Sequence, residues 1–203
     1  MKEPMRPYPV ITVAKEIVKN YRDFIKANDE KKGTDGYKKI TFSKEKLVMI
    51  LYYVQGYAKQ QNEIPMFRDP MVALSTVYLD IKSAEFQKVF QMFGYMRENL
   101  AGAIMEIDTK ILSGYNPELL APLDKRMIYD VCRGFIPYDA RNIFGRLLVN
   151  EQTFQNGVAR TLINYENNEP AAAINLKLLG KEFRIRSARK LASTAYLLKT
   201  ERA

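Results

Sequence analysis

The chain has 203 residues, of which 47% are hydrophobic and 27% are charged, so it can bury a core and is not expected to be disordered throughout. Histidine is absent and Cys132 is the single cysteine, which excludes an internal disulfide and essentially excludes a zinc site. The longest apolar run, Leu47 to Val54, is too short to cross a bilayer, and no apolar signal segment follows Met1. We therefore expect a protein of the cytoplasm that has no membrane association.

The predicted elements of the first half are mostly helical. Residues 1–9 are rich in proline and should be extended, and a helix is expected from Thr12 to Ala27. The polar stretch Asn28–Lys39 predicts an exposed loop. Ser43 is a good N-cap for a second helix, in which apolar residues recur at helical spacing from Leu47 to Ala58. Two prolines make residues 62–70 irregular.

The second half also favours helices. They are expected over residues 71–93, 97–112, 123–132, 138–148 and 151–164, and, in pieces broken at Gly180, over 171–199. Residues 183–186 are the only short candidate for a strand. The sequence thus predicts an all-α fold: a compact multi-helix domain over residues 10–165 after an extended N-terminal segment, followed by a basic, mostly helical C-terminal extension over 166–203.

A run of specific residues between Lys46 and Ala73 adds a family resemblance. The residues in register are Lys46, Leu47, Ile50, Leu51, Tyr52, Tyr53, Gln55, Gly56 and Tyr57, followed at fixed intervals by Pro65, Phe67 and Ala73. In this order they resemble the Panacea domain, a phage-associated family that includes the SocA-like antitoxins. The resemblance covers about residues 10–160, and a degraded copy of the family's closing segment runs from Tyr138 to Phe154. The chain departs from the family at residues 74–78, which replace a Gly-Pro-Val turn.

The resemblance implies a non-enzymatic module that binds a partner protein, either a cognate toxin or a host factor, in equal stoichiometry and neutralises it. A phage counter-defence inhibitor of a host immune complex would use the same binding physics. No nucleophile–base set, phosphate loop or cluster of metal ligands is visible in the sequence, so we expect no enzyme activity, no cofactor and no metal. Without histidine, Cys132 is expected to be a small buried residue and not a nucleophile.

The loop after the motif is the candidate partner-binding site. Loops carry function more often than cores do, although a hydrophobic plug beneath the loop is an equal alternative. Tyrosines of the motif are better explained as core residues, and Gly56 as a helix end or a place of close packing. The candidate partner-binding residues are Tyr57, Met66, Phe67, Arg68 and Asp69.

The net charge of +9 is unevenly distributed. From Lys177 onwards there are eight basic and two acidic residues, a net charge of +6. Phosphates of a nucleic acid could bind there, with Phe183 or Tyr196 stacking on bases, but a solvated helix face or an acidic protein partner would explain the same charge. The candidate contacts are Lys181, Arg184, Arg186, Arg189 and Lys190.

Overall fold

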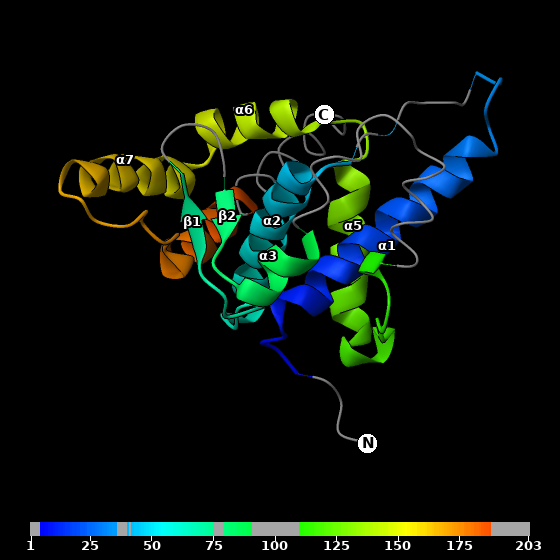
Figure 1. Ribbon diagram of the computed structural model, residues 1–203, viewed down its shortest axis with the longest axis horizontal. Helices are drawn as coiled ribbons and strands as arrows, with labels where there is room; N and C mark the ends of the chain where they lie inside the picture. The colour runs from blue at the N-terminus through cyan, green and yellow to red at the C-terminus, as the bar shows by residue number, and fades with distance from the viewer. Residues whose placement is uncertain (1–4, 36–39, 41, 75–78, 91–109, 188–203) are drawn as a thin grey trace, which may run out of the picture.

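The structure of the protein, a computed structural model, describes residues 5–35, 40, 42–74, 79–90 and 110–187. Helix α2 (Lys44–Asn62) lies at its centre (Figure 1). Helices α1 (Val10–Asp29) and α5 (Pro122–Gly134) cover one side of α2, while α6 (Ala140–Asn150) crosses one end. Helix α7 (Gln152–Glu166) and two short strands lie on the opposite side from α1. The mostly all-α fold expected from the sequence is confirmed.

Helix α2 begins where the sequence predicts. The Ser43 side chain accepts a hydrogen bond from the Lys46 backbone N–H at 3.3 Å, which satisfies one free donor of the first turn. Every residue from Lys46 to Gly56 is buried, so this helix has no solvent-facing side along its first three turns. The other helices therefore use α2 as the surface on which they pack.

The prediction of a helix from Met71 is wrong over its first part. Strands β1 (Met71–Ala73) and β2 (Leu79–Ile81) pair antiparallel, with Val72 opposite Asp80. Val72 also forms an antiparallel bridge with Ala173, so β1 lies between two neighbours. Strands of three residues are too short to show an alternating pattern, and apolar residues at helical spacing follow them in helix α3 (Ala84–Phe90). The helix predicted over residues 97–112 lies almost entirely outside the described residues.

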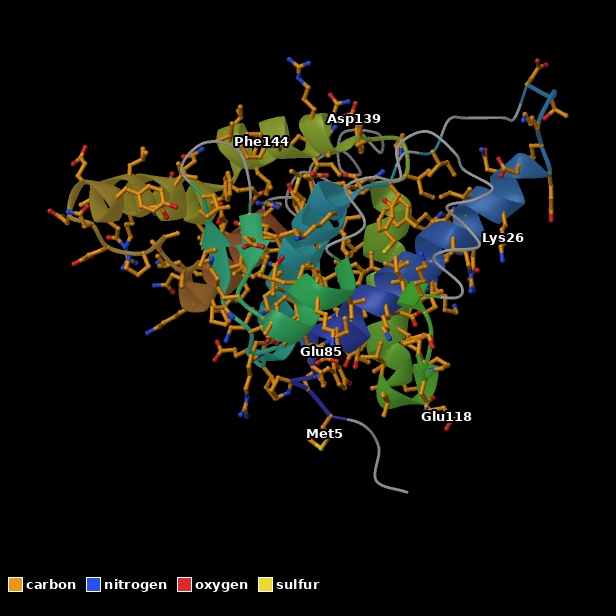
Figure 2. The ribbon with its side chains drawn as sticks, viewed as in Figure 1. Met5, Lys26, Glu85, Glu118, Asp139 and Phe144 are labelled. Atoms are coloured by element: carbon orange, nitrogen blue, oxygen red, sulfur yellow. The ribbon has the colours of Figure 1, made fainter. Side chains whose placement is uncertain are left out.

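The helices of the second half start close to their predicted positions. After the short turn η3 (Pro117–Leu119), α5 begins at Pro122, which suits the first helical position. The Asp139 side chain accepts a hydrogen bond from Asn142 N–H at 2.7 Å and so caps α6 (Figure 2). Among the described residues, no helix is long and apolar enough to cross a membrane.

The segment after α7 is part of the body. Residues 176–187 form one helical segment, so the predicted break at Gly180 and the strand candidate at 183–186 are wrong. Gly180 does not break the helix because it lies against α2, where an added Cβ would come within 3.0 Å of Lys59 Cβ. Leu179 and Phe183 of this segment join the hydrophobic core. Residues 176–187 of the predicted extension therefore pack on α2.

Candidate partner-binding groove

Two residues of the Lys46–Ala73 motif, Gln55 and Gly56, stabilise the packing of other segments against α2. The Gln55 side chain accepts a hydrogen bond from Met66 N–H at 2.7 Å and donates one to the Phe67 carbonyl at 2.9 Å. It thereby holds the loop after α2 against the helix with all partners buried. Gly56 has no room for a side chain, because an ideal Cβ there would lie 2.4 Å from the Phe183 ring.

Replacing Gln55 with leucine is expected to lower the free energy of unfolding by about 2–3 kcal/mol, because three buried backbone groups of Met66 and Phe67 lose their partner while volume is largely kept. Urea denaturation of both proteins measures this. The control is Gln155→Ala, since the carbonyls that Gln155 binds belong to exposed Leu148 and Val149 and can turn to water. A Gln55→Leu variant as stable as the parent would contradict this role.

The predicted loop surface does not assemble. Met66 and Phe67 are fully buried, so the prediction that they contact a partner is wrong, and the hydrophobic-plug alternative is correct for both. They are buried because the Gln55 side chain holds their backbone against α2. Tyr8 also pairs with this stretch, since the Tyr8 N–H donates a hydrogen bond to Met66 O at 2.8 Å. Arg68 is exposed and Asp69 is partly exposed. Tyr57 is 37% exposed. Its ring meets the Phe183 ring edge to face, with 5.0 Å between the two ring centroids.

The candidate cations of the C-terminal segment have different surroundings. Arg184 forms an ion pair with Glu63 at 2.6 Å, and Arg186 forms one with Glu151. Lys181 is exposed, while Arg189 and Lys190 lie outside the described residues. Phe183 is 1% exposed, so the hypothesis that its ring stacks on bases is wrong. Two of the three described cations are thus already neutralised by carboxylates of the same chain.

A buried carboxylate fixes this segment to the body. Glu151, which is 2% exposed, accepts hydrogen bonds from Arg186 and from the Tyr53 hydroxyl, the latter at 3.2 Å. Burial raises the pKa of the Glu151 carboxyl, and the pairing with Arg186 opposes that rise. The Arg186 guanidinium also lies 4.6 Å from the centre of the Phe183 ring. The segment is consequently positioned by charge and by packing together.

A second carboxylate joins the segment to α7. Glu182 accepts hydrogen bonds from Gln152 N–H at 2.6 Å and from Thr153 N–H at 3.1 Å. These are free donors of the first turn of α7, where a negative charge is favourable. Glu182 therefore serves as an N-cap supplied from another helix, and it sets the distance between α7 and residues 176–187.

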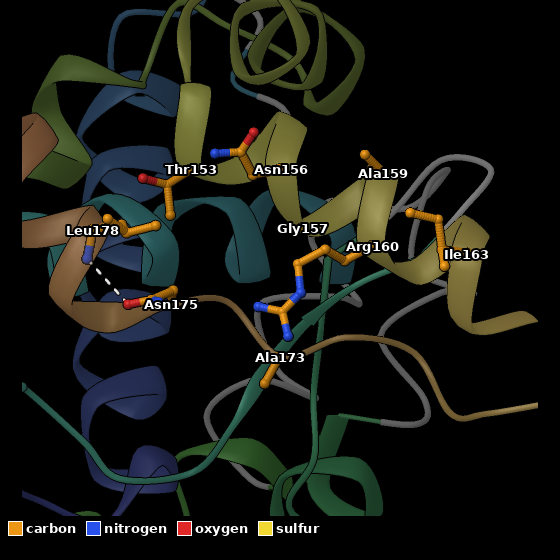
Figure 3. Close-up of a pocket in the computed structure, with 9 residues that line it drawn as sticks. All are labelled: Thr153, Asn156, Gly157, Ala159, Arg160, Ile163, Ala173, Asn175 and Leu178. Carbon is orange, nitrogen blue, oxygen red and sulfur yellow. Dashed lines mark hydrogen bonds between the residues drawn. The ribbon is translucent and has the colours of Figure 1, made fainter.

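Between these two elements runs a groove, which is the candidate site. It consists of two adjoining cavities of about 470 and 240 Å³ that share Thr153, Asn156 and Leu178. The wider one continues to Ile185, and the narrower one ends between Arg160 and Ala173. Figure 3 shows α7 along one side of the narrower cavity and the chain from Ala173 to Leu178 along the other.

The groove combines apolar walls with unpaired cations. Leu178, Ile185 and Ile163 line it and are each 43–56% exposed. Arg160 and Lys181 also line it, and within the described part of the chain neither makes an ion pair. Apolar contacts framed by cations can bind an acidic, partly apolar surface.

The single cysteine of the chain is not among the residues that line this groove. Cys132, far from it on α5, is fully buried, and burial raises the pKa of its thiol. Among the described residues, no group of three or more cysteine, aspartate or glutamate side chains lies close enough to hold a metal ion.

Sequence reasoning missed this groove. It placed a protein partner on the loop after α2, and it considered the C-terminal segment as a site for nucleic acid or an acidic partner; of the residues it named there, Lys181 and Arg186 line the groove. The available signal was Leu178 and Ile185, seven residues apart on one helical face and next to Lys181. Comparison with protein-family models, with curated proteins and with solved structures finds no match to this chain.

Proposed function

We propose that this chain is a non-enzymatic protein-binding module of the antitoxin type, which neutralises a partner protein by direct, stoichiometric binding. The observation that carries the proposal is the groove between α7 and residues 176–187, with exposed Leu178 and Ile185 beside Arg160 and Lys181, two cations that pair with no carboxylate among the described residues. Apolar side chains in such numbers along one groove are typical of a surface that a partner covers. The resemblance of residues 46–73 to the Panacea domain supplies the antitoxin part of the proposal.

The walls of the groove are held in place by contacts within the chain, so binding a partner there should cost little conformational entropy. One wall is held by Glu182 on the first turn of α7, and the floor by the Arg186–Glu151 pair and Phe183. Preorganised walls reduce the conformational entropy that a complex must overcome. A partner that presents carboxylates around an apolar centre would match the groove in both charge and polarity.

The test is capture of the partner from a nuclease-treated lysate of the source cells, using three forms of the full chain. The wild type and the control Arg126→Glu/Arg133→Glu, which changes the net charge equally but on exposed positions of α5, are expected to retain one protein at near-equal stoichiometry. The groove variant Arg160→Glu/Lys181→Glu is expected to lose at least tenfold in affinity, because two attractive charges become repulsive.

Neutralisation is then tested directly by expressing the captured partner. Growth inhibition by the partner should be relieved by the wild-type chain and not by the groove variant, and a captured host immune component would place the chain among counter-defence inhibitors. Retention of the partner by the groove variant would contradict the groove as the site. Material that the wild type retains from an untreated lysate but loses entirely after nuclease treatment would instead favour nucleic-acid binding by the basic C-terminal residues.

A further inference from the structure

The narrower end of the groove exposes a strand edge. Residues 172–174 run antiparallel to β1 and form a single bridge with it, at Val72 and Ala173: Ala73 N–H donates to Ala172 O at 3.3 Å, and Ile174 N–H donates to Met71 O at 2.7 Å. These two bonds flank the pair Val72–Ala173, which makes it a non-hydrogen-bonded antiparallel pair. The backbone N–H and C=O of Ala173 consequently point away from β1.

Those two groups are not hydrogen-bonded to any residue that the structure describes. The neighbouring Ala172 N–H is bonded to the Thr161 hydroxyl at 2.8 Å, and the same hydroxyl donates to Ala73 O at 2.6 Å. In the part of the chain that the structure describes, no group bonds to the N–H or the C=O of Ala173. Ala173 is exposed and lines the narrower cavity, whereas Ala172 and Ile174 are buried. An edge strand with an open donor–acceptor pair is a template for another strand.

Helix α7 covers one face of this edge without closing it. Gly157 allows α7 to approach the sheet, because an added Cβ would meet Ile174 at 2.9 Å and Ala73 Cβ at 3.1 Å. Beyond that contact, about 240 Å³ remains open between α7 and Ala173. Figure 3 shows the Arg160 side chain extending from α7 toward Ala173. Its guanidinium makes no ion pair with any described residue.

We propose that an extended acidic segment of the partner protein binds here by adding a strand to the outer edge of residues 172–174. Backbone bonds to Ala173 supply register, and Arg160 selects a carboxylate on the face of the added strand that α7 covers. This inference deepens the proposed function and rests on it. It names the recognition mode and the chemistry of the segment that enters the groove.

The experiment selects random twelve-residue peptides displayed on phage against the full chain, and measures the affinity of synthetic copies by fluorescence anisotropy. The variant Ala173→Pro removes the outward N–H and no described internal bond, and proline is tolerated on edge strands. It is expected to weaken the selected peptides at least tenfold. The matched control Ala173→Val keeps the N–H and should stay within threefold of the wild type.

Two further measurements protect the result from a folding defect. Methylating the peptide nitrogen that faces Ala173 should weaken binding to the wild-type protein at least tenfold, while methylating the next residue should not. The variant Arg160→Glu should weaken acidic peptides at least tenfold and favour basic ones in a new selection. Selection of no peptide, or of peptides that Ala173→Pro and N-methylation leave unaffected, would overturn the proposal.

The inference and the proposed function fail in different ways. If the captured partner is lost by Arg160→Glu/Lys181→Glu but is retained equally by wild type and Ala173→Pro, strand addition is overturned and the groove remains the binding site. If no partner is retained by any form of the chain, the proposed function is overturned, and the peptide selection alone decides whether the edge accepts a strand.

Discussion

Replacing Phe183 with alanine is expected to lower the free energy of unfolding by about 3–5 kcal/mol. The ring is 1% exposed and lies among Tyr52, Tyr53 and Tyr57, with centroid distances of 6.5, 6.0 and 5.0 Å. Truncation leaves a cavity above Gly56 that the rigid α2 cannot fill. Urea or thermal denaturation followed by circular dichroism measures the loss.

The control for Phe183 is Ile185→Ala, two residues further along the same helical segment. Ile185 is 44% exposed, so its truncation should cost less than about 1 kcal/mol. The contact can also be tested from α2: Gly56→Ala should destabilise by about 1–3 kcal/mol, because its Cβ would overlap the Phe183 ring. Equal stabilities of the Phe183→Ala variant and the parent would show that residues 176–187 do not belong to the folded core.

The second large effect concerns Lys46 and depends on pH. Lys46 is 1% exposed, and burial lowers the pKa of its ammonium group to about 8, although Asp139 and Cys132 act in the opposite direction. Its Nζ lies 4.8 Å from the centre of the Tyr21 ring. From the ordinary value of 10.5 to about 8, the shift corresponds to about 3 kcal/mol.

The sign follows from proton binding in the two states. Below pH 8 the ammonium is charged in both states, and the folded protein bears the full cost of burying it. Between pH 8 and 10.5 the unfolded chain binds more protons than the folded one, so the contribution of Lys46 to stability rises with pH. The variant Lys46→Met removes this charge. The free energy of unfolding of Lys46→Met should therefore exceed that of the wild type by most at pH 7, and this difference should shrink by about 3 kcal/mol toward pH 10.5.

Urea denaturation of both proteins at pH 7, 8, 9 and 10 measures the difference. Comparing the two removes the contribution of the other titrating groups that both proteins share. The control is Lys46→Arg, whose guanidinium stays charged throughout this range, so its difference from the methionine variant should not change with pH. A wild-type-to-methionine difference that is constant from pH 7 to 10 would contradict a lowered pKa at Lys46.

Local signals were enough to predict most of the helices, but not the start of α3 or the unbroken helical segment of residues 176–187. Ser43 ahead of a periodic apolar run located α2, and Pro122 and Asp139 stand where α5 and α6 begin. The strands could not be predicted in the same way. One of the two neighbours of β1 is Ala173, about a hundred residues away, and three-residue strands carry no alternation of their own.

The predicted contact residues could not be assessed from the sequence, because their burial and ion pairing depend on residues elsewhere in the chain. The sequence shows that Met66 and Phe67 are apolar residues of a loop, but not that Gln55 draws them inward. Likewise it shows that Arg184 and Arg186 are basic, but not that Glu63 and Glu151 neutralise them. The close packing expected as one explanation of Gly56 is confirmed, because its contact with Phe183 requires a residue without a side chain.

The position of Val72 between β2 and Ala173 has a consequence for the kinetics of folding. One neighbour of β1 follows within ten residues, whereas the other must close a loop of about a hundred residues. Loop closure is an entropic cost that precedes the gain from contact, so the pairing with Ala173 is expected to form late. Contacts that form after the rate-limiting step affect the unfolding rate and leave the folding rate almost unchanged. The segment that lines the groove would then govern how long the native state lasts once it has formed.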